Sequence, residues 1–511
     1  MTVDVLFVSP GNSKAIYQGL AHDFSAIEPP TWALLLAQSV RAVGFEAAIL
    51  DVNAERLGLD QVVNRVVRLK PRLICLVVYG QNPNSGTVNM SGAVQISEKL
   101  KSHDDRLIIG IIGSHASALP REVLVTEPSI DIVFCNEGVY SLRNVLRADL
   151  HDVSQLIDVK GLALRAEGKV MLTVPEVIVP QERMDEDLPG YAWDLLPYKE
   201  KPLDLYRSHF WHASYLHEKR TPFVAIYTSL GCTFQCDFCM INILNRDNTD
   251  EVGVASDFPK MRFWSPELII SEFDKLVEMG VETLRISDEM FLLNKRYYSP
   301  LCEMLRDRGY GEKLNMWAYS RIDTVRDMSQ LKLVREAGIR WLALGIESGD
   351  EAIRKRATKG RFQDLDIRSV INNIEESGIE VIANYLFGLP GDGFESMNRT
   401  LQLSLELCTT AWNGYPAMAL PGSQLYKEAR KKGYELPATY AGYSFLGYDT
   451  VPLPTDHLTP AQVLEFRDHA FVTYHSAPRF QEKVRRRFGS KALENINKML
   501  EVKIQRRLLQ N

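Results

Sequence analysis

The chain has 511 residues, of which 45% are hydrophobic and 24% charged, and its formal net charge is −6. This length predicts about three domains, and the composition excludes a disordered or fibrous protein. No apolar run approaches the ~18 residues that cross a bilayer, so we expect no transmembrane segment, and the acidic balance argues against nucleic-acid binding. Seven cysteines, three of them clustered, form no disulfide framework, which favours a reducing, cytoplasmic location.

The first 150 residues alternate short apolar runs with helical patterns. Strands are expected at residues 3–8, 47–52, 73–78, 107–112 and 130–134. The N-terminal run lacks the basic leader and cleavage site of a signal peptide. Strands of this kind, separated by helices, indicate a parallel sheet covered on both faces, which is a doubly wound, Rossmann-like α/β fold. Ligands of such folds bind beyond the carboxyl ends of the strands.

The loops at those strand ends are rich in Gly and Ser, which permit a flat or bulky ligand to approach the backbone closely. They read SPGN, YGQNPNSG, GSHASALP and NEGVYS. No GxGxxG follows the first strand, and no GxxxxGK[ST] occurs anywhere. Neither a nicotinamide dinucleotide nor a P-loop nucleotide is therefore supported.

A second alternation of strands and helices follows a connector, expected at residues 151–220. Its strands are predicted at residues 223–228, 282–287, 314–319, 340–346, 380–387 and 414–419. Six such units predict a partial (β/α)6 barrel over residues 221–430, with its chemistry at the C-terminal strand ends. The remaining residues, 431–511, are expected to form a mostly helical extension.

Three cysteines, Cys232, Cys236 and Cys239, follow the first predicted barrel strand in the spacing C-x3-C-x2-C. They cannot close a tetrahedral zinc site alone, and no histidine lies in or just after the motif. Soft thiolates select iron–sulfur clusters, so the trio can hold three corners of a [4Fe–4S] cube. The fourth iron would then be open to the amino and carboxylate groups of a small molecule. The alternatives are buried structural cysteines, or a zinc site completed by a distant residue.

The other four cysteines lie in or beside apolar segments and are expected to be small core residues. They are Cys75, Cys135, Cys302 and Cys408.

With the aromatic Phe238 before its last cysteine, this loop resembles the signature of the radical S-adenosylmethionine (SAM) superfamily. The resemblance implies that the cluster on Cys232, Cys236 and Cys239 binds SAM and reduces it to a 5′-deoxyadenosyl radical. It also implies an external one-electron reductant of the flavodoxin or ferredoxin type. Further SAM-binding residues are implied for the methionine amino group, its carboxylate, the ribose and the adenine. In that order they are Asp288 and Glu289, Ser320 and Arg321, Glu347 and Ser348, and Pro421 and Gly422.

The N-terminal domain, residues 1–150, resembles the cobalamin-binding module of one subclass of that superfamily, through LDVNAERL, GSHASALP, NEG and the connector piece AWDLLP. The motif D-x-H-x-x-G, whose His ligates cobalt, is absent, so the cobalt would lack a lower His ligand. His115 either touches the corrin or caps its loop, and Trp32 packs against either the corrin edge or the core. The cobalamin-binding residues that the resemblance implies are Ser9, Pro10, Asp51, Asn53, Tyr79, Gly80, Gln81, Gly113, Ser114, His115, Glu137 and Gly138.

The resemblance therefore implies a cobalamin-dependent radical SAM enzyme. It would move a methyl group from SAM through methylcobalamin to an unactivated carbon, or phosphorus, of a small metabolite. One alternative is a non-methylating rearrangement, cyclisation or ring contraction. Another is a non-catalytic protein that senses cobalamin or redox state. A tyrosine near a strand end, Tyr319, Tyr385 or Tyr415, could handle a proton, although packed aromatics are common at such positions.

The C-terminal segment is basic, with ten Lys and Arg against three Glu between Arg479 and Asn511. Such residues commonly form the solvated face of a terminal helix. A second interpretation is that this segment caps the barrel mouth and offers Arg479 and Arg485–Arg487 to an anionic substrate.

Overall fold

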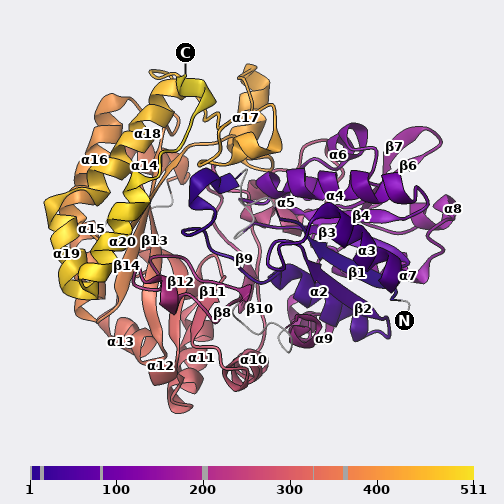
Figure 1. Ribbon diagram of the computed structural model, residues 1–511, viewed down its shortest axis with the longest axis horizontal. Helices are drawn as coiled ribbons and strands as arrows, with labels where there is room; N and C mark the ends of the chain where they lie inside the picture. The colour runs from indigo at the N-terminus through magenta and orange to yellow at the C-terminus, as the bar shows by residue number, and fades with distance from the viewer. Residues whose placement is uncertain are drawn as a thin grey trace.

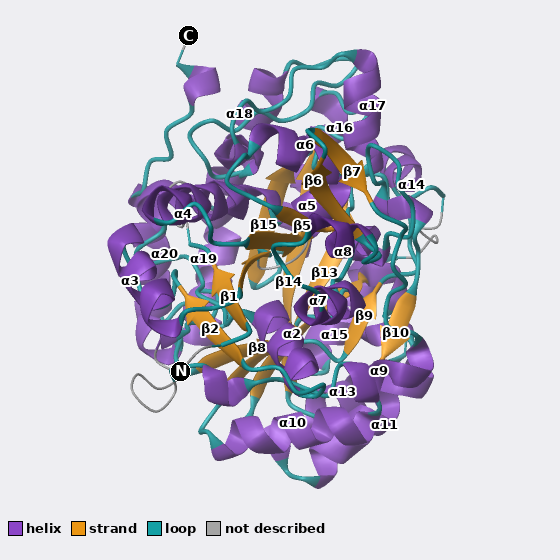
Figure 2. Ribbon diagram, turned by 90° about the vertical axis from the view of Figure 1, so that its right-hand side faces the viewer, coloured by secondary structure: helices purple, strands orange, loops and turns teal. Residues whose placement is uncertain are grey.

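Two β-sheets, one from each half of the chain, form the body of the protein (Figure 1). The computed structural model describes residues 3–11, 16–80, 85–197, 205–325, 327–360 and 366–510. Within these ranges, no helix combines the length and apolar character needed to cross a membrane. Figure 2 views the molecule from the side of the N-terminal sheet, with the barrel strands behind it.

The N-terminal sheet has the strand order β2-β1-β3-β4-β5-β6-β7. Its first five strands are parallel, which confirms the doubly wound fold. They are β1 (Val5–Ser9), β2 (Ala47–Asp51), β3 (Leu73–Val78), β4 (Ile109–Gly113) and β5 (Ile132–Phe134). Two antiparallel strands, β6 (Leu162–Ala166) and β7 (Lys169–Leu172), then extend the sheet into the segment expected as a connector.

Helices cover both faces of this sheet because its strands are apolar on both sides. Val5 and Phe7 of β1 pack in one core with α2 (Thr31–Arg41) and α7 (Val139–Arg147). Leu6 and Val8 pack in a second core with α3 (Leu59–Leu69) and α4 (Met90–His103). The shorter helices of this half are α5 (Ser114–Ala118), α6 (Pro120–Thr126), α8 (Val153–Ile157) and α9 (Met184–Asp187).

The second sheet is a parallel half-barrel with the order β15-β14-β13-β12-β11-β8, as expected. Its strands are β8 (Phe223–Ile226), β11 (Thr283–Ile286), β12 (Asn315–Arg321), β13 (Ile339–Glu347), β14 (Glu380–Phe387) and β15 (Ala411–Pro416). A short hairpin, β9 (Ser229–Gly231) with β10 (Met261–Phe263), carries the chain into and out of the cysteine loop. The helices between the strands are α10 (Pro266–Glu278), α11 (Lys295–Asp307), α12 (Tyr310–Lys313), α13 (Met328–Glu336), α14 (Glu351–Ala357), α15 (Ile367–Glu376), α16 (Phe394–Leu407) and α17 (Gln424–Lys432).

From residue 460 to residue 501 the C-terminal extension is helical, and it packs against β15, the edge strand of the half-barrel. Its helices are drawn in yellow in Figure 1. It contains α18 (Pro460–His475), α19 (Pro478–Phe488) and α20 (Ser490–Glu501). Tyr474 of α18 donates a hydrogen bond to the Thr409 carbonyl just before β15, at 2.7 Å. The open side of the sheet is thereby covered by α18 rather than left as an unpaired edge.

Candidate active site

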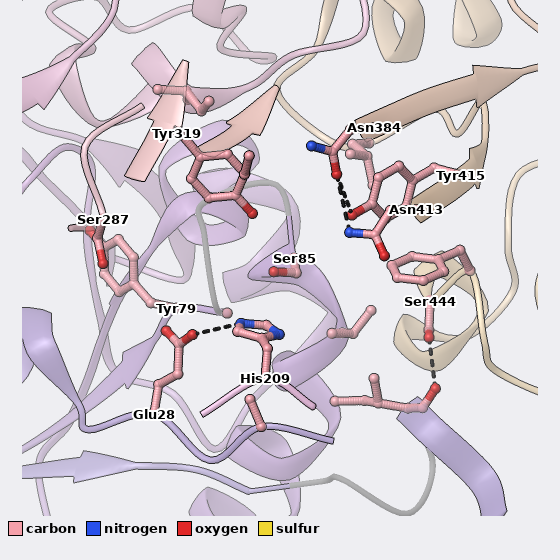
Figure 3. A pocket seen from close by; sticks show the side chains of 18 of the residues that line it. Glu28, Tyr79, Ser85, His209, Ser287, Tyr319, Asn384, Asn413, Tyr415 and Ser444 are labelled. Atoms are coloured by element: carbon pink, nitrogen blue, oxygen red, sulfur yellow. Dashed lines mark hydrogen bonds and ion pairs between the residues drawn. The ribbon is translucent and has the colours of Figure 1, made fainter. Parts of the chain in front are cut away.

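A cavity of about 600 Å³ lies where the two halves of the chain meet. The loops after β1, β2 and β3 line one part of it, and the cysteine loop and the ends of the barrel strands line the rest. Figure 3 shows a close view of this pocket, with Tyr79 of the N-terminal half among side chains of the barrel strands such as Tyr319 and Asn384. Ligands held by the N-terminal strand ends and ligands held by the cysteine loop would therefore share one cavity.

The three cysteines all line this cavity. Their loop is held by Asn242, whose side-chain amide donates to the Cys232 carbonyl and accepts from the Cys232 N–H, both at 2.8 Å. Gly231, just before the loop, has a φ of +81°, and a Cβ there would lie 2.1 Å from the Lys260 carbonyl oxygen. The chain can make this turn only without a side chain.

Burial raises the pKa of the Cys232 thiol to about 11 and that of Cys236 to about 12. The loop alone therefore holds neutral thiols, and a bound cation is needed to keep them as thiolates. In the described part of the chain, no three His, Cys, Asp or Glu side chains converge on one ion. A [4Fe–4S] cube does not require such convergence, because each thiolate binds its own iron. The donor set therefore fits a cluster with one open iron.

The adjacent acids Asp288 and Glu289 have different environments. Asp288 does not line the cavity, and its carboxylate accepts hydrogen bonds at 2.6 Å from the Thr228 N–H and from the hydroxyls of Thr228 and Ser229. It thus holds together the turn between β8 and β9. Glu289 lines the cavity, and desolvation raises its pKa to about 8. Of the two, Glu289 is available to a ligand's amino group.

Glu347 lines the cavity at a β-bulge, where the register between β13 and β14 shifts. Its φ is +64°, a left-handed conformation that is costly for a residue with a side chain. Burial raises its pKa to about 7, against the opposing effect of Arg321. Bulges of this kind re-aim a side chain, and here the strain coincides with the cavity wall. The next residue, Ser348, does not line the cavity, and its hydroxyl lies 3.2 Å from the Thr400 hydroxyl.

Arg321 and Ser320, at the end of β12, both line the cavity. The Arg321 guanidinium makes two hydrogen bonds of 2.6 Å to the Asp323 carboxylate. Its Cζ also lies 3.6 Å from the centroid of the Phe234 ring in the cysteine loop, a cation–π contact. Phe238 lines the cavity as well. Arg321 is therefore fixed in position beside the cysteine loop.

Pro421 and Gly422 lie outside the cavity lining. The Gly422 carbonyl accepts a hydrogen bond of 2.8 Å from the Ala255 N–H. Gly422 has a φ of +101°, and a Cβ on this residue would meet Ala118 of α5 and Met240 of the cysteine loop. This turn therefore packs the barrel against the N-terminal half.

Half of the twelve residues expected to bind cobalamin line the cavity, namely Ser9, Pro10, Asp51, Asn53, Tyr79 and Gly80. A Cβ on Gly80 would lie 2.3 Å from the Ser85 hydroxyl, so the close approach of these two residues leaves no room for a side chain at position 80. Tyr79 lies against Trp32, with ring centroids 5.3 Å apart, and both line the cavity. An aromatic surface bordered by backbone suits a large flat ligand. Gln81 lies outside the described residues.

The other five expected cobalamin residues, Gly113, Ser114, His115, Glu137 and Gly138, lie outside the cavity lining. His115 is buried with its Nδ1 3.2 Å from the Thr87 hydroxyl, and burial lowers its pKa to about 4. The Glu137 carboxylate pairs with Arg262 of β10 and accepts from the Val179 N–H at 2.6 Å. Gly138 has a φ of +81°, and a Cβ there would lie 2.1 Å from Ile112. These five residues therefore hold the loops after β4 and β5 in place against neighbouring segments.

Glu28 and His209, which line the cavity, belong to a buried ionic group that the sequence did not reveal. Both oxygens of Glu28 accept from Arg285 Nη1 at 2.8 Å, and one lies 3.0 Å from His209 Nε2 (Figure 3). Arg285 in turn lies over the Trp317 ring, 4.8 Å from its centroid. The three charged or titratable residues come from the N-terminal half, the connector and β11, so no local sequence pattern joins them.

The sequence analysis also missed a second group, whose residues belong to β14 and β15. The Asn384 side-chain oxygen accepts from Asn413 Nδ2 at 3.1 Å and from the Tyr415 hydroxyl at 3.4 Å (Figure 3). Tyr319 and Tyr415 both line the cavity. Tyr385, the third tyrosine considered, does not, and its buried hydroxyl has no hydrogen-bond partner among the described residues.

The basic residues of α19 lie away from the cavity. Arg485 pairs with Glu482 of the same helix, Arg487 pairs with Glu380, and Arg479 donates to the Glu406 carbonyl. None of Arg479 and Arg485–Arg487 lines the cavity, so the prediction that they meet the substrate there is wrong. The C-terminal extension does cover the cavity, but through other residues, including Arg467, Phe471 and His475.

Comparison with known proteins also divides the chain into an N-terminal part and a half-barrel part. A family model described as the B12 binding domain matches residues 17–146, and one described as the radical SAM superfamily matches residues 226–404. An uncharacterised methyltransferase of Pyrococcus horikoshii is 23% identical over 476 residues, which cover 93% of each chain. The two matched ranges thus include β2 to β5 of the N-terminal sheet and β11 to β14 of the half-barrel.

Two solved structures share the fold. The TsrM methyltransferase from Kitasatospora setae, with cobalamin and a [4Fe–4S] cluster bound, matches with a TM-score of 0.64 and 17% identity, covering 87% of this chain and 85% of that one. The radical enzyme OxsB, with aqua-cobalamin and SAM bound, matches with a TM-score of 0.66 and 16% identity, covering 98% and 72%. The present chain belongs to the cobalamin-dependent radical SAM enzymes. Its cofactors are a [4Fe–4S] cluster, SAM and cobalamin.

Proposed function

We propose that this enzyme is a methyltransferase, which moves a methyl group from SAM to an unactivated carbon or phosphorus atom of a small molecule. The observation that carries this proposal is the shared cavity. Cys232 and its two companions line it together with Ser9, Tyr79 and Gly80 from the N-terminal strand ends. A methyl carrier and a source of radicals can serve one substrate only if both border the same enclosed space.

The binding roles follow from the side chains that line the cavity. The three cysteines would hold the cluster, and Glu289, Arg321 and Glu347 would hold the amino, carboxylate and ribose groups of SAM. The loops carrying Gly80 and Asp51 would hold cobalamin. When bound, the cluster supplies one electron for the cleavage of SAM, and cobalamin supplies a carrier for the methyl group.

The protein itself binds and orients these groups and excludes water. Glu289, whose pKa burial raises to about 8, is poised to ionise when an ammonium group enters beside it. Trp211, Trp317 and Trp412 line the cavity, and their rings keep water from a reactive radical. The similar proteins from Pyrococcus horikoshii and Kitasatospora setae, both named methyltransferases, support methyl transfer as the outcome.

An external one-electron donor of the flavodoxin or ferredoxin type would reduce the cluster. None of the seven cysteines lies in a disulfide, which suits a reducing compartment such as the cytoplasm.

The test needs no knowledge of the substrate. Anaerobically reconstituted enzyme is incubated with SAM and a low-potential reductant, with and without cobalamin, and the nucleoside products are measured. We expect S-adenosylhomocysteine only when cobalamin is present, because the methyl group then has a carrier. Formation of 5′-deoxyadenosine with no S-adenosylhomocysteine under either condition would instead indicate a non-methylating radical reaction.

A further inference from the structure

Helix α18 of the C-terminal extension places a buried arginine, Arg467, in the cavity wall. Its side chain is 5% exposed. The Arg467 Nε donates to the Gly414 carbonyl of β15 at 2.7 Å, and its Nη1 donates to Asp468 Oδ1 at 2.9 Å. Among the described residues its Nη2 makes no hydrogen bond. Gly414 lies between Asn413 and Tyr415, so the guanidinium is hydrogen-bonded to the strand that carries these two cavity-lining side chains.

The positive charge of Arg467 is only partly neutralised. The Asp468 carboxylate also accepts from Arg506, whose Nε and Nη2 each lie 2.8 Å from one of its oxygens. Two buried guanidinium groups thus share one carboxylate. His475, which also lines the cavity, adds no charge near neutral pH, because burial lowers its pKa to about 4.

Two other arginines of the site are balanced by acids. Arg285 is matched by Glu28, and Arg321 by Asp323. A buried charge without a counter-ion is costly, so the one-charge excess at Arg467 favours an anion from the ligand.

The space beside Arg467 is aromatic. Its Cζ lies 5.4 Å from the Phe471 ring centroid and 5.9 Å from that of Phe445, and both rings line the cavity. Phe445 meets Tyr415 edge to face, with centroids 4.8 Å apart. Because Nε and Nη1 are already engaged, Nη2 remains for the ligand. The guanidinium of Arg467 thus has one nitrogen left to donate and one positive charge in excess. This suits a ligand group with a single negative charge, such as a carboxylate, rather than a phosphate dianion.

We propose that Arg467 anchors the carboxylate of the substrate, whose apolar or aromatic body lies between Phe445, Phe471 and the strand ends of β14 and β15. This inference rests on the proposed function, because it names the substrate class of that same cavity. It assigns substrate selection to the C-terminal extension, through α18 rather than through the basic helix α19.

The test measures binding without turnover. Holoenzyme with cluster, cobalamin and SAM is equilibrated anaerobically with a panel of matched pairs, each an aryl-alkyl carboxylate such as 1-naphthylacetate and its neutral amide. Dissociation constants are compared for the wild type, Arg467→Gln, Arg467→Lys and the exposed control Arg486→Gln. We expect the wild type and Arg486→Gln to prefer carboxylates by about tenfold or more, the usual gain from a charge-assisted hydrogen bond. Arg467→Gln should lose this preference and Arg467→Lys should keep part of it.

A variant with the opposite effect separates charge recognition from folding. Asp468→Asn removes the shared carboxylate, so the preference for carboxylates should rise above that of the wild type. If Arg467 and Asp468 had only a structural role, Arg467→Gln and Asp468→Asn would both weaken the binding of the carboxylate and of its amide alike. The inference is overturned if no carboxylate binds in preference to its amide, or if Arg467→Gln retains the preference.

A second readout distinguishes substrate from cofactor. Cobalamin carries a phosphate in its tail, and Arg467→Gln should bind as much cobalamin as the wild type if its partner is the substrate. Loss of cobalamin from this variant would assign the guanidinium to the cofactor and contradict the inference. S-adenosylhomocysteine formation without substrate is measured separately and tests methyl transfer, whereas the dissociation constants test the role of Arg467. Either proposal can therefore fail while the other is upheld.

Discussion

Glu137 and Arg262 form a buried ion pair that joins the N-terminal half to the cysteine-loop hairpin. Two hydrogen bonds of 3.1 and 2.6 Å link the carboxylate to the guanidinium, and each side chain is 1% exposed. Arg262 also donates to the Val179 carbonyl at 2.7 Å. The pair therefore fixes how the loop after β5 meets strand β10, although neither residue lines the cavity.

Replacing Glu137 by Gln should destabilise the protein by ~3–5 kcal/mol, because it leaves the buried Arg262 charge without its partner. The melting temperature of the apo-protein measures this loss. Arg430→Gln, which breaks the exposed pair with Glu122, is the control and should change stability by less than ~1 kcal/mol. Equal effects of the two substitutions would show that the buried pair does not join the two halves.

Glu347 combines backbone strain with a place in the cavity wall. Glu347→Gly should stabilise the apo-protein by ~1 kcal/mol, since glycine adopts a positive φ without penalty, and should weaken SAM binding at least tenfold. Glu167→Gly, at an exposed positive-φ turn between β6 and β7, should give a similar gain with unchanged SAM binding. Normal SAM affinity in Glu347→Gly would contradict the assigned role.

Glu289 should make the stability of the apo-protein depend on pH. Its pKa rises from an ordinary 4.5 to about 8 on folding, because burial disfavours the carboxylate. The folded state thus binds the proton more tightly than the unfolded state, and this stabilisation is fully present below pH 4.5 and is lost as the pH rises through 8. Melting temperatures should therefore fall less steeply across this window in Glu289→Gln than in the wild type. Parallel profiles for the two proteins would refute the raised pKa.

The architecture could be predicted from the sequence because the alternation of apolar runs with helical patterns and the spacing of the cysteines indicate it. Apolar runs such as Leu73–Val78 predicted the parallel strands of both sheets, but not β6 and β7, which lie in the segment expected as a connector. The tight spacing from Cys232 to Cys239 predicted a metal-binding loop, and the structure brings all three cysteines to the cavity wall. Side-chain direction at a loop could not be predicted in the same way. Asp288 and Glu289 are adjacent and chemically alike, yet only Glu289 faces the cavity, because Thr228 and Ser229 hold the other carboxylate.

Residues that meet only in the folded protein left no local signal. Glu28, His209 and Arg285 are far apart in the sequence, and Arg467 looks like one more charge on an amphipathic helix. The arginine triplet of α19 was conspicuous in sequence and yet lies outside the cavity, since Glu482 and Glu380 pair with two of its members. Charge clustering along the chain therefore did not indicate which arginine lines the cavity.

The cysteine loop is the most direct test of the whole account. Iron, cobalamin, 5′-deoxyadenosine and S-adenosylhomocysteine are measured in anaerobically reconstituted wild type and in Cys232→Ala, Cys236→Ala and Cys239→Ala, with the buried core variant Cys302→Ala as control. We expect each loop variant to lose cluster iron and 5′-deoxyadenosine formation while still binding cobalamin, and the control to retain all four. Loop variants that keep their iron and still cleave SAM would contradict the account.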